Sequence, residues 1–161
     1  MRIIPFILYL FLITFHVAIL GDLTAILGIK FNMFVLMVTL VALYKGDGEA
    51  IWFGFFAGLV FGSQRLDLMP WEIVIATLTA IVVKEISTRI NFESIASRVI
   101  IIGSCVLLHD ILIILLISAR EFFFLFTRYV LPGVVYTVIL GWLFFMIKDG
   151  RITWQRVKAL F

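Results

Sequence analysis

Long apolar runs alternate with short polar breaks along this chain of 161 residues. The last two runs, at 99–117 and 129–147, are about as long as an α-helix must be to cross the hydrocarbon core of a bilayer. The breaks between runs carry charged residues, glycine and proline, which are typical of connections between helices. The pattern predicts an all-α integral membrane protein, a six-transmembrane-helix bundle with spans at about 3–20, 23–44, 50–62, 69–83, 99–117 and 129–147. The residues 1–161 are thereby interpreted as a single membrane domain with no soluble domain.

Two of these runs are less regular than the others. Lys30 and Asn32 interrupt the second run, so that its uninterrupted part covers only 31–44. The third run, 50–62, would rise about 20 Å as a helix, which is less than the roughly 30 Å of a hydrocarbon core. It either extends through its polar flanks to cross the membrane or dips in and returns as a re-entrant segment.

The distribution of Lys and Arg favours a full crossing. With six spans, one side holds Arg2, Lys45, Lys84, Arg89, Arg98, Lys148, Arg151, Arg156 and Lys158, and the other side holds Lys30, Arg65, Arg120 and Arg128. A re-entrant third segment would divide the same residues more evenly. Because cytoplasmic loops are enriched in basic residues, the sequence predicts that both termini are cytoplasmic.

Small residues at intervals of four predict helix packing faces. Gly54, Gly58 and Gly62 form a ladder on one face of the third helix, and a second stripe in the sixth helix consists of Gly133, Thr137 and Gly141. Within a membrane, close backbone approach at such residues is a main source of association energy between helices. Each stripe is therefore expected to pack against a partner helix.

Two segments resemble interfacial rather than spanning helices. One is the aromatic stretch between the fifth and sixth spans, with Phe122, Phe123, Phe124 and Phe126 flanked by charge. It is expected either to anchor in lipid or to dock a partner protein. The other is the basic segment 151–161, for which attraction to anionic lipid is expected.

Composition supports a membrane location and excludes several function classes. Hydrophobic residues make up 64% of the chain and charged residues 14%. A net charge of +3, spread between the apolar runs, does not indicate a nucleic-acid-binding protein. The single cysteine excludes a disulfide within the chain, and the two histidines exclude a histidine-rich metal site. No metalloprotease, phosphate-loop or serine-nucleophile motif is present, so neither an enzyme nor a cofactor is expected.

His109 and Asp110 are the main candidates for polar function, because they lie near the middle of the fifth span. A carboxylate at that depth is costly unless it is paired or faces a wet cavity. Adjacent helical residues point about 100° apart, so we expect Asp110 to find a partner elsewhere, such as His16, Thr14 or a basic residue. These side chains then form either an interhelical hydrogen bond or a polar pocket or partner contact. Glu72, by contrast, is expected to be solvated at the start of its helix.

The third helix also carries a family resemblance. The sequence GFFAGL at 54–59, preceded by the turn KGDGE at 45–49, resembles the signature region of the MreD family of rod shape-determining membrane proteins. The length, the six apolar segments and the lack of a soluble domain also resemble this family, over essentially the whole chain. The family often has an acidic residue where this chain has Gly62, so no acidic role is carried over to that position.

The resemblance implies a noncatalytic scaffold of the cell-elongation machinery in the bacterial cytoplasmic (inner) membrane. Its implied partner is MreC, and through MreC the actin-like MreB and the glycosyltransferase–transpeptidase pair that builds lateral peptidoglycan. The family's fold is thought to be similar to the substrate-binding subunits of energy-coupling-factor transporters. The alternative function is therefore a membrane subunit that binds a vitamin-like small molecule. Such subunits often use alanines of the first helix for docking, whereas the first span here has only Ala18.

Overall fold

The computed structural model describes residues 3–90 and 94–150, which are almost entirely helical. Their only β-pairing is a single bridge between Ile26 and Ile29. The predicted interfacial segment 151–161 lies outside the described residues. The longer helices are α1 (Ile3–Phe15), α3 (Met33–Tyr44), α4 (Asp47–Gly62), α5 (Met69–Arg89), α6 (Ile95–Ser118) and α8 (Leu131–Lys148). The shorter ones are η1 (His16–Leu20), α2 (Gly21–Leu23), η2 (Ala119–Glu121), α7 (Phe122–Leu125) and η3 (Phe126–Val130).

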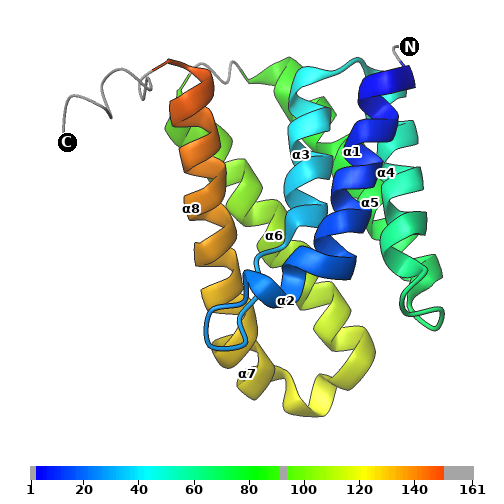
Figure 1. Cartoon of the computed structure of the whole chain (residues 1–161), viewed down its shortest axis with the longest axis vertical. Coiled ribbons are helices and arrows are strands. Elements are labelled where there is room, and N and C mark those ends of the chain that lie inside the picture. Colours follow the sequence, from blue (N-terminus) through cyan, green and yellow to red (C-terminus); the bar gives the residue numbers. More distant parts are fainter. Residues whose placement is uncertain (1–2, 91–93, 151–161) are drawn as a thin grey trace.

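The long helices run alternately in opposite directions between two ends of the bundle (Figure 1). α1 begins and α8 ends at the upper end of the view, where α3 also passes into α4. The α2–α3 loop and the turn around α7 lie at the lower end. We call these the terminal end and the loop end.

α3 is the central helix of the bundle. Every residue from Phe34 to Ala42 is buried, so this helix has no polar face. A helix that is apolar all round must be surrounded by other elements, and α3 contacts α1, α4, α5, α6 and α8. At 12 residues it rises only about 18 Å.

The second predicted span differs from the structure. Residues 23–44 do not form one helix, because the first helical run continues to Leu23 and a loop occupies 24–32. This loop reverses at Leu27 and Gly28, which have φ values of 54° and 80°. Such left-handed conformations are incompatible with a continuous helix. The interruption at Lys30 and Asn32 therefore marks the end of a loop, and Asn32 caps α3 by accepting a hydrogen bond from the Val35 amide.

The glycine ladder of α4 lies directly on α5. A Cβ atom added at Gly54 would lie 2.8 Å from the Ala76 carbonyl oxygen, and one added at Gly58 would lie 2.6 Å from the Ile73 Cα. At Gly62 the same atom would lie 2.8 Å from the Met69 Cα. The two backbones thus approach so closely that no side chain fits between them.

The stripe on α8 packs elsewhere and does not meet the ladder. A Cβ atom at Gly141 would lie 3.2 Å from Ile102 Cδ1 of α6, and one at Gly133 would lie 3.3 Å from the Lys30 carbonyl oxygen. Thr137 between them is fully buried. The two stripes therefore join different pairs of elements.

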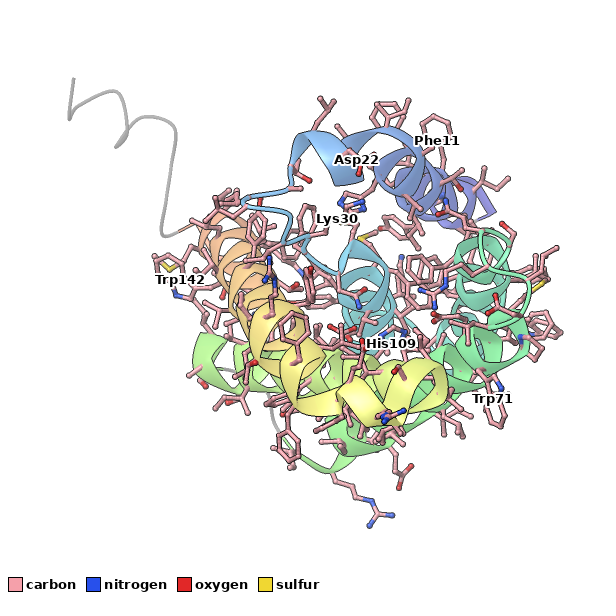
Figure 2. The ribbon with its side chains drawn as sticks, turned by 90° about the horizontal axis from the view of Figure 1, so that it is seen from below. Phe11, Asp22, Lys30, Trp71, His109 and Trp142 are labelled. Carbon is pink, nitrogen blue, oxygen red and sulfur yellow. The ribbon has the colours of Figure 1, made fainter. Side chains whose placement is uncertain are left out.

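Within the described residues, two stretches are long and apolar enough to cross a membrane, namely Pro5–Leu23 and Ile95–Lys148. The second stretch folds back on itself, so that α6 and α8 lie side by side (Figure 1). Large apolar side chains point away from the bundle, among them Phe11, Trp71 and Trp142, while His109 lies inside it (Figure 2). The two stretches together suggest that the protein is membrane-associated.

Candidate functional site

A buried histidine lies between two carboxyl groups inside the bundle. The Nε2 atom of His109 on α6 is 2.8 Å from Oε2 of Glu72, which lies in the first turn of α5. Its Nδ1 atom is 2.9 Å from Oδ1 of the neighbouring Asp110. The His109 and Glu72 side chains are only 4% and 6% exposed. These three side chains, together with Asn32, are called the buried polar network below.

Asn32 ties this network to two further elements. Its side-chain Nδ2 donates a hydrogen bond of 2.8 Å to Asp110 Oδ1. Its backbone amide donates to the Thr137 hydroxyl of α8 at 2.9 Å, and that hydroxyl donates in turn to the Gly133 carbonyl. The network therefore joins the start of α3 with α5, α6 and α8 at one point in the bundle.

Hydrogen bonding joins the members of this network. Each of the two contacts between His109 and a carboxyl group needs one shared proton to be a hydrogen bond. Buried ionisable groups are tolerated only where close partners of this kind satisfy them. The Phe34 ring packs edge-on near the His109 ring, with the ring centroids 5.5 Å apart.

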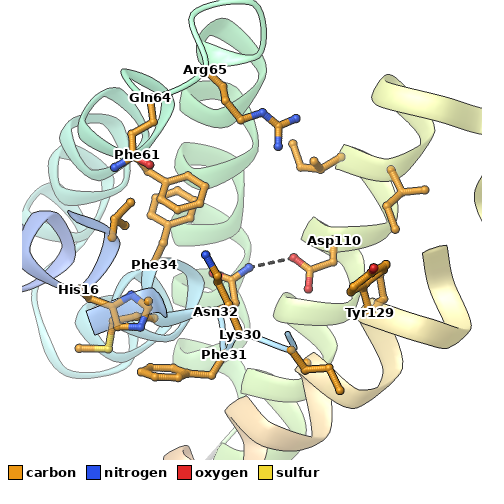
Figure 3. Close-up of a pocket in the computed structure, with 18 of the residues that line it drawn as sticks. His16, Lys30, Phe31, Asn32, Phe34, Phe61, Gln64, Arg65, Asp110 and Tyr129 are labelled. Atoms are coloured by element: carbon orange, nitrogen blue, oxygen red, sulfur yellow. Dashed lines mark hydrogen bonds between the residues drawn. The ribbon is translucent and has the colours of Figure 1, made fainter. Parts of the chain in front are cut away.

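A cavity of about 520 Å³ opens beside this network at the loop end of the bundle (Figure 3). Asn32 and Asp110 belong to its wall, and so do residues of the α2–α3 loop and of the α4–α5 connection. One side is aromatic, where Phe34 and Phe61 are stacked with their ring centroids 4.4 Å apart. Further apolar lining comes from Ile113, Ile114 and Ile117 of α6.

His16 lies on the wall of the same cavity. It is 6% exposed, and its ring lies 4.4 Å from the ring of Phe31. Its Nε2 atom is buried and has no hydrogen-bond partner among the described residues. Burying a polar atom without a partner is unfavourable, so this nitrogen requires an explanation beyond packing.

The structure brings the predicted polar residues together but changes their partners. His109 and Asp110 are in direct contact, and Asp110 bonds to Asn32, so the expected pairing with His16, Thr14 or a basic residue is wrong. Glu72 was expected to be solvated and is instead buried against His109. The reason is that Glu72 lies on the inward face of α5, where Gly58 of α4 approaches its backbone and His109 of α6 contacts its carboxyl group.

The network contains two residues that the sequence pattern did not identify as candidate site residues, namely Glu72 and Asn32. A signal for Glu72 was present, because Ala76 and Ala80 follow it at intervals of four and lie with it on the buried face of α5. Asn32 directly precedes an apolar helical run, which is the typical position of a helix N-cap. Thr137 already belonged to the predicted packing stripe.

The phenylalanine cluster lies at the loop end, away from the buried polar network. Phe122 stacks on Phe126, with ring centroids 5.6 Å apart. Phe123 and Phe124 are 81% and 56% exposed. Among the described residues, no group of three or more His, Cys, Asp or Glu side chains is arranged to hold a metal ion.

The fold and the site together define an all-helical bundle with a buried charged network and an adjoining cavity. Comparison of the chain with models of known protein families, with curated proteins and with solved structures yields no match.

Proposed function

We propose that this protein is a noncatalytic membrane scaffold of the bacterial cell-elongation complex that binds MreC and supports lateral peptidoglycan synthesis. The observation that carries the proposal is the resemblance of the sequence at 45–59 to the MreD signature region. This segment forms the start and middle of α4, whose glycines pack against α5. A chain whose spans occupy most of its length acts chiefly through the surface that it presents to other membrane proteins.

The ladder itself is not the proposed docking surface, because α5 already covers it. Outward-facing apolar residues at the loop end, including Phe123 and Phe124, are available to a partner or to lipid. The buried polar network has a structural role in this proposal, since it fixes the positions of α3, α5, α6 and α8 relative to one another.

MreC is expected to co-purify with the affinity-tagged protein from native membranes, and mass spectrometry identifies it. Purification with the tag alone from the same strain is the control. Absence of MreC from a sample in which the tagged protein elutes as a single folded species would contradict the scaffold proposal.

Within this proposal the chain crosses the bacterial inner membrane six times, with both termini in the cytoplasm. The alternate direction of the long helices and the charge distribution support this arrangement. α4 has 16 residues and a charged first turn, so its crossing relies on polar flanks.

Cysteine labelling tests whether α4 crosses. In a Cys105→Ala background, we expect a membrane-impermeant maleimide added to intact spheroplasts to label Ser63→Cys, and to label Gly48→Cys only after lysis. The two positions lie just beyond and just inside opposite ends of α4. Equal labelling of both positions before lysis would contradict the crossing.

A second candidate function is a small-molecule-binding membrane subunit, as in energy-coupling-factor transporters. The cavity beside Asp110 is the observation that favours it, since its volume is typical of ligand pockets. A vitamin that co-purifies in stoichiometric amount would favour this candidate over the scaffold.

A further inference from the structure

The cavity at the loop end contains charged groups of both signs. Arg65 and Lys30 contribute to its wall from two separate connections, and Asp110 contributes from α6 (Figure 3). Opposite charges at separated places on one cavity wall match a ligand that itself carries both charges.

The positive part has one cation without a partner. The guanidinium group of Arg65 has no hydrogen bond or ion pair with any described residue, whereas Lys30 is paired with Asp22, whose side chain is 88% exposed. A guanidinium offers a planar set of donors that fits a carboxylate with two parallel hydrogen bonds. Arg65 is therefore the stronger candidate for binding an anionic group.

The negative part retains a free acceptor. Both hydrogen bonds of Asp110 use Oδ1, one with Asn32 and one with His109. Oδ2 has no partner among the described residues, although the side chain is only 22% exposed. An ammonium group entering the cavity could donate to Oδ2 without displacing any bond of the network.

Two further features indicate that the cavity holds a molecule and not only water. The buried His16 Nε2 lacks a partner within the protein, so a polar group of a ligand could satisfy it. The stacked Phe34 and Phe61 rings and three isoleucines of α6 all line the cavity and give it an apolar part. Apolar walls with a few fixed polar groups are characteristic of small-molecule sites.

We propose that this cavity binds a small zwitterion with an apolar body, of the chemical class of an amino acid or dipeptide. Its carboxylate lies against Arg65, with Lys30 nearby, and its ammonium group lies against Asp110. Its side chain occupies the apolar part beside Phe34 and Phe61. This site is independent of MreC binding, and it extends the second candidate function by naming the ligand class.

Binding is measured with the purified full-length protein in detergent, by thermal shift and then by calorimetry. The probes are the twenty common L-amino acids and their apolar dipeptides. For the tightest-binding probe, two matched analogues are compared, one lacking the ammonium group and one lacking the carboxylate. We expect each analogue to bind about tenfold more weakly or worse, the loss expected for one charge-assisted contact.

Two variants assign the contacts. Because Arg65 is exposed, the Arg65→Gln variant is expected to fold normally. It should weaken binding of the zwitterion by about tenfold. Arg120→Gln removes a positive charge at the same end but outside the cavity, and should leave affinity unchanged. Asp110→Asn should weaken binding of the zwitterion but not of the analogue that lacks the ammonium group, and this comparison holds even if the variant is less stable.

Three results would overturn the proposal. The first is that no probe binds at millimolar concentration to protein that is folded by thermal melting. The second is that an analogue binds as tightly as the zwitterion, which would make the cavity a site for simple organic ions. The third is equal weakening by Arg65→Gln and Arg120→Gln, which would indicate a general charge effect.

Discussion

Gly58→Ala is expected to destabilise the protein by about 3 kcal/mol or more, the upper range for overpacking a rigid interior. The added Cβ atom would lie 2.6 Å from the Ile73 Cα and 2.8 Å from the Glu72 carbonyl oxygen. Both obstacles are backbone atoms, so no rotamer change relieves the overlap and α4 must move away from α5. Gly58→Leu is expected to prevent assembly of the bundle. The measurement is thermal unfolding in detergent, with the yield of monodisperse protein as a second readout.

Gly48→Ala is the matched control, because it lies on the same helix. Nothing lies within 4 Å of a Cβ atom at that position, so its stability should change by about 0.5 kcal/mol or less. A melting temperature for Gly58→Ala equal to that of Gly48→Ala would show that α4 and α5 do not pack as closely as described.

His109→Leu should have the second large effect, because it removes the only side-chain partner of the Glu72 carboxyl group among the described residues and one of the two partners of Asp110. Glu72 and Asp110 would then face an apolar side chain, and breaking a buried ion pair typically costs about 3–5 kcal/mol. Thermal unfolding in detergent again provides the measurement. Arg89→Gln is the control, since it breaks an exposed pair with Glu85 and is expected to cost about 0.5 kcal/mol or less.

A double variant separates loss of pairing from loss of packing. Glu72→Leu combined with His109→Leu should be more stable than His109→Leu alone, because Glu72 is then no longer a buried carboxylate without a partner. The contradicting result is a double variant that is less stable than His109→Leu by as much as Glu72→Leu alone destabilises the unchanged protein. The contact between Glu72 and His109 would then contribute no coupling energy.

The helical class and the packing faces could be predicted from the sequence because both depend on local periodicity. Apolar runs of helical length and small residues at intervals of four are visible in any single stretch of chain. The ladder on α4 accordingly predicts that some helix approaches its backbone. The sequence did not show which helix this is. In the structure it is α5, whose small residues Ala76 and Ala80 lie directly opposite Gly54.

The second predicted span was wrong because hydropathy alone does not detect a reversal of the chain. Leu27 is apolar, yet it has a positive φ beside Gly28 and belongs to a loop. Asn32 was counted as an interruption of a helix, whereas it is the residue at which the helix starts.

The buried polar network separates what the sequence determined from what only the tertiary structure decided. The sequence by itself determined that Asp110 lies deep in an apolar run and therefore needs a partner, because an isolated charge there is too costly. Its partner from another helix depended on the packing of α3, α5 and α6, which places Asn32 within hydrogen-bond distance of Asp110 and Glu72 within hydrogen-bond distance of His109. These two hydrogen bonds act over about 3 Å and join residues far apart in the chain, so no local pattern encodes them. The same packing left His16 Nε2 without a partner on the wall of the cavity.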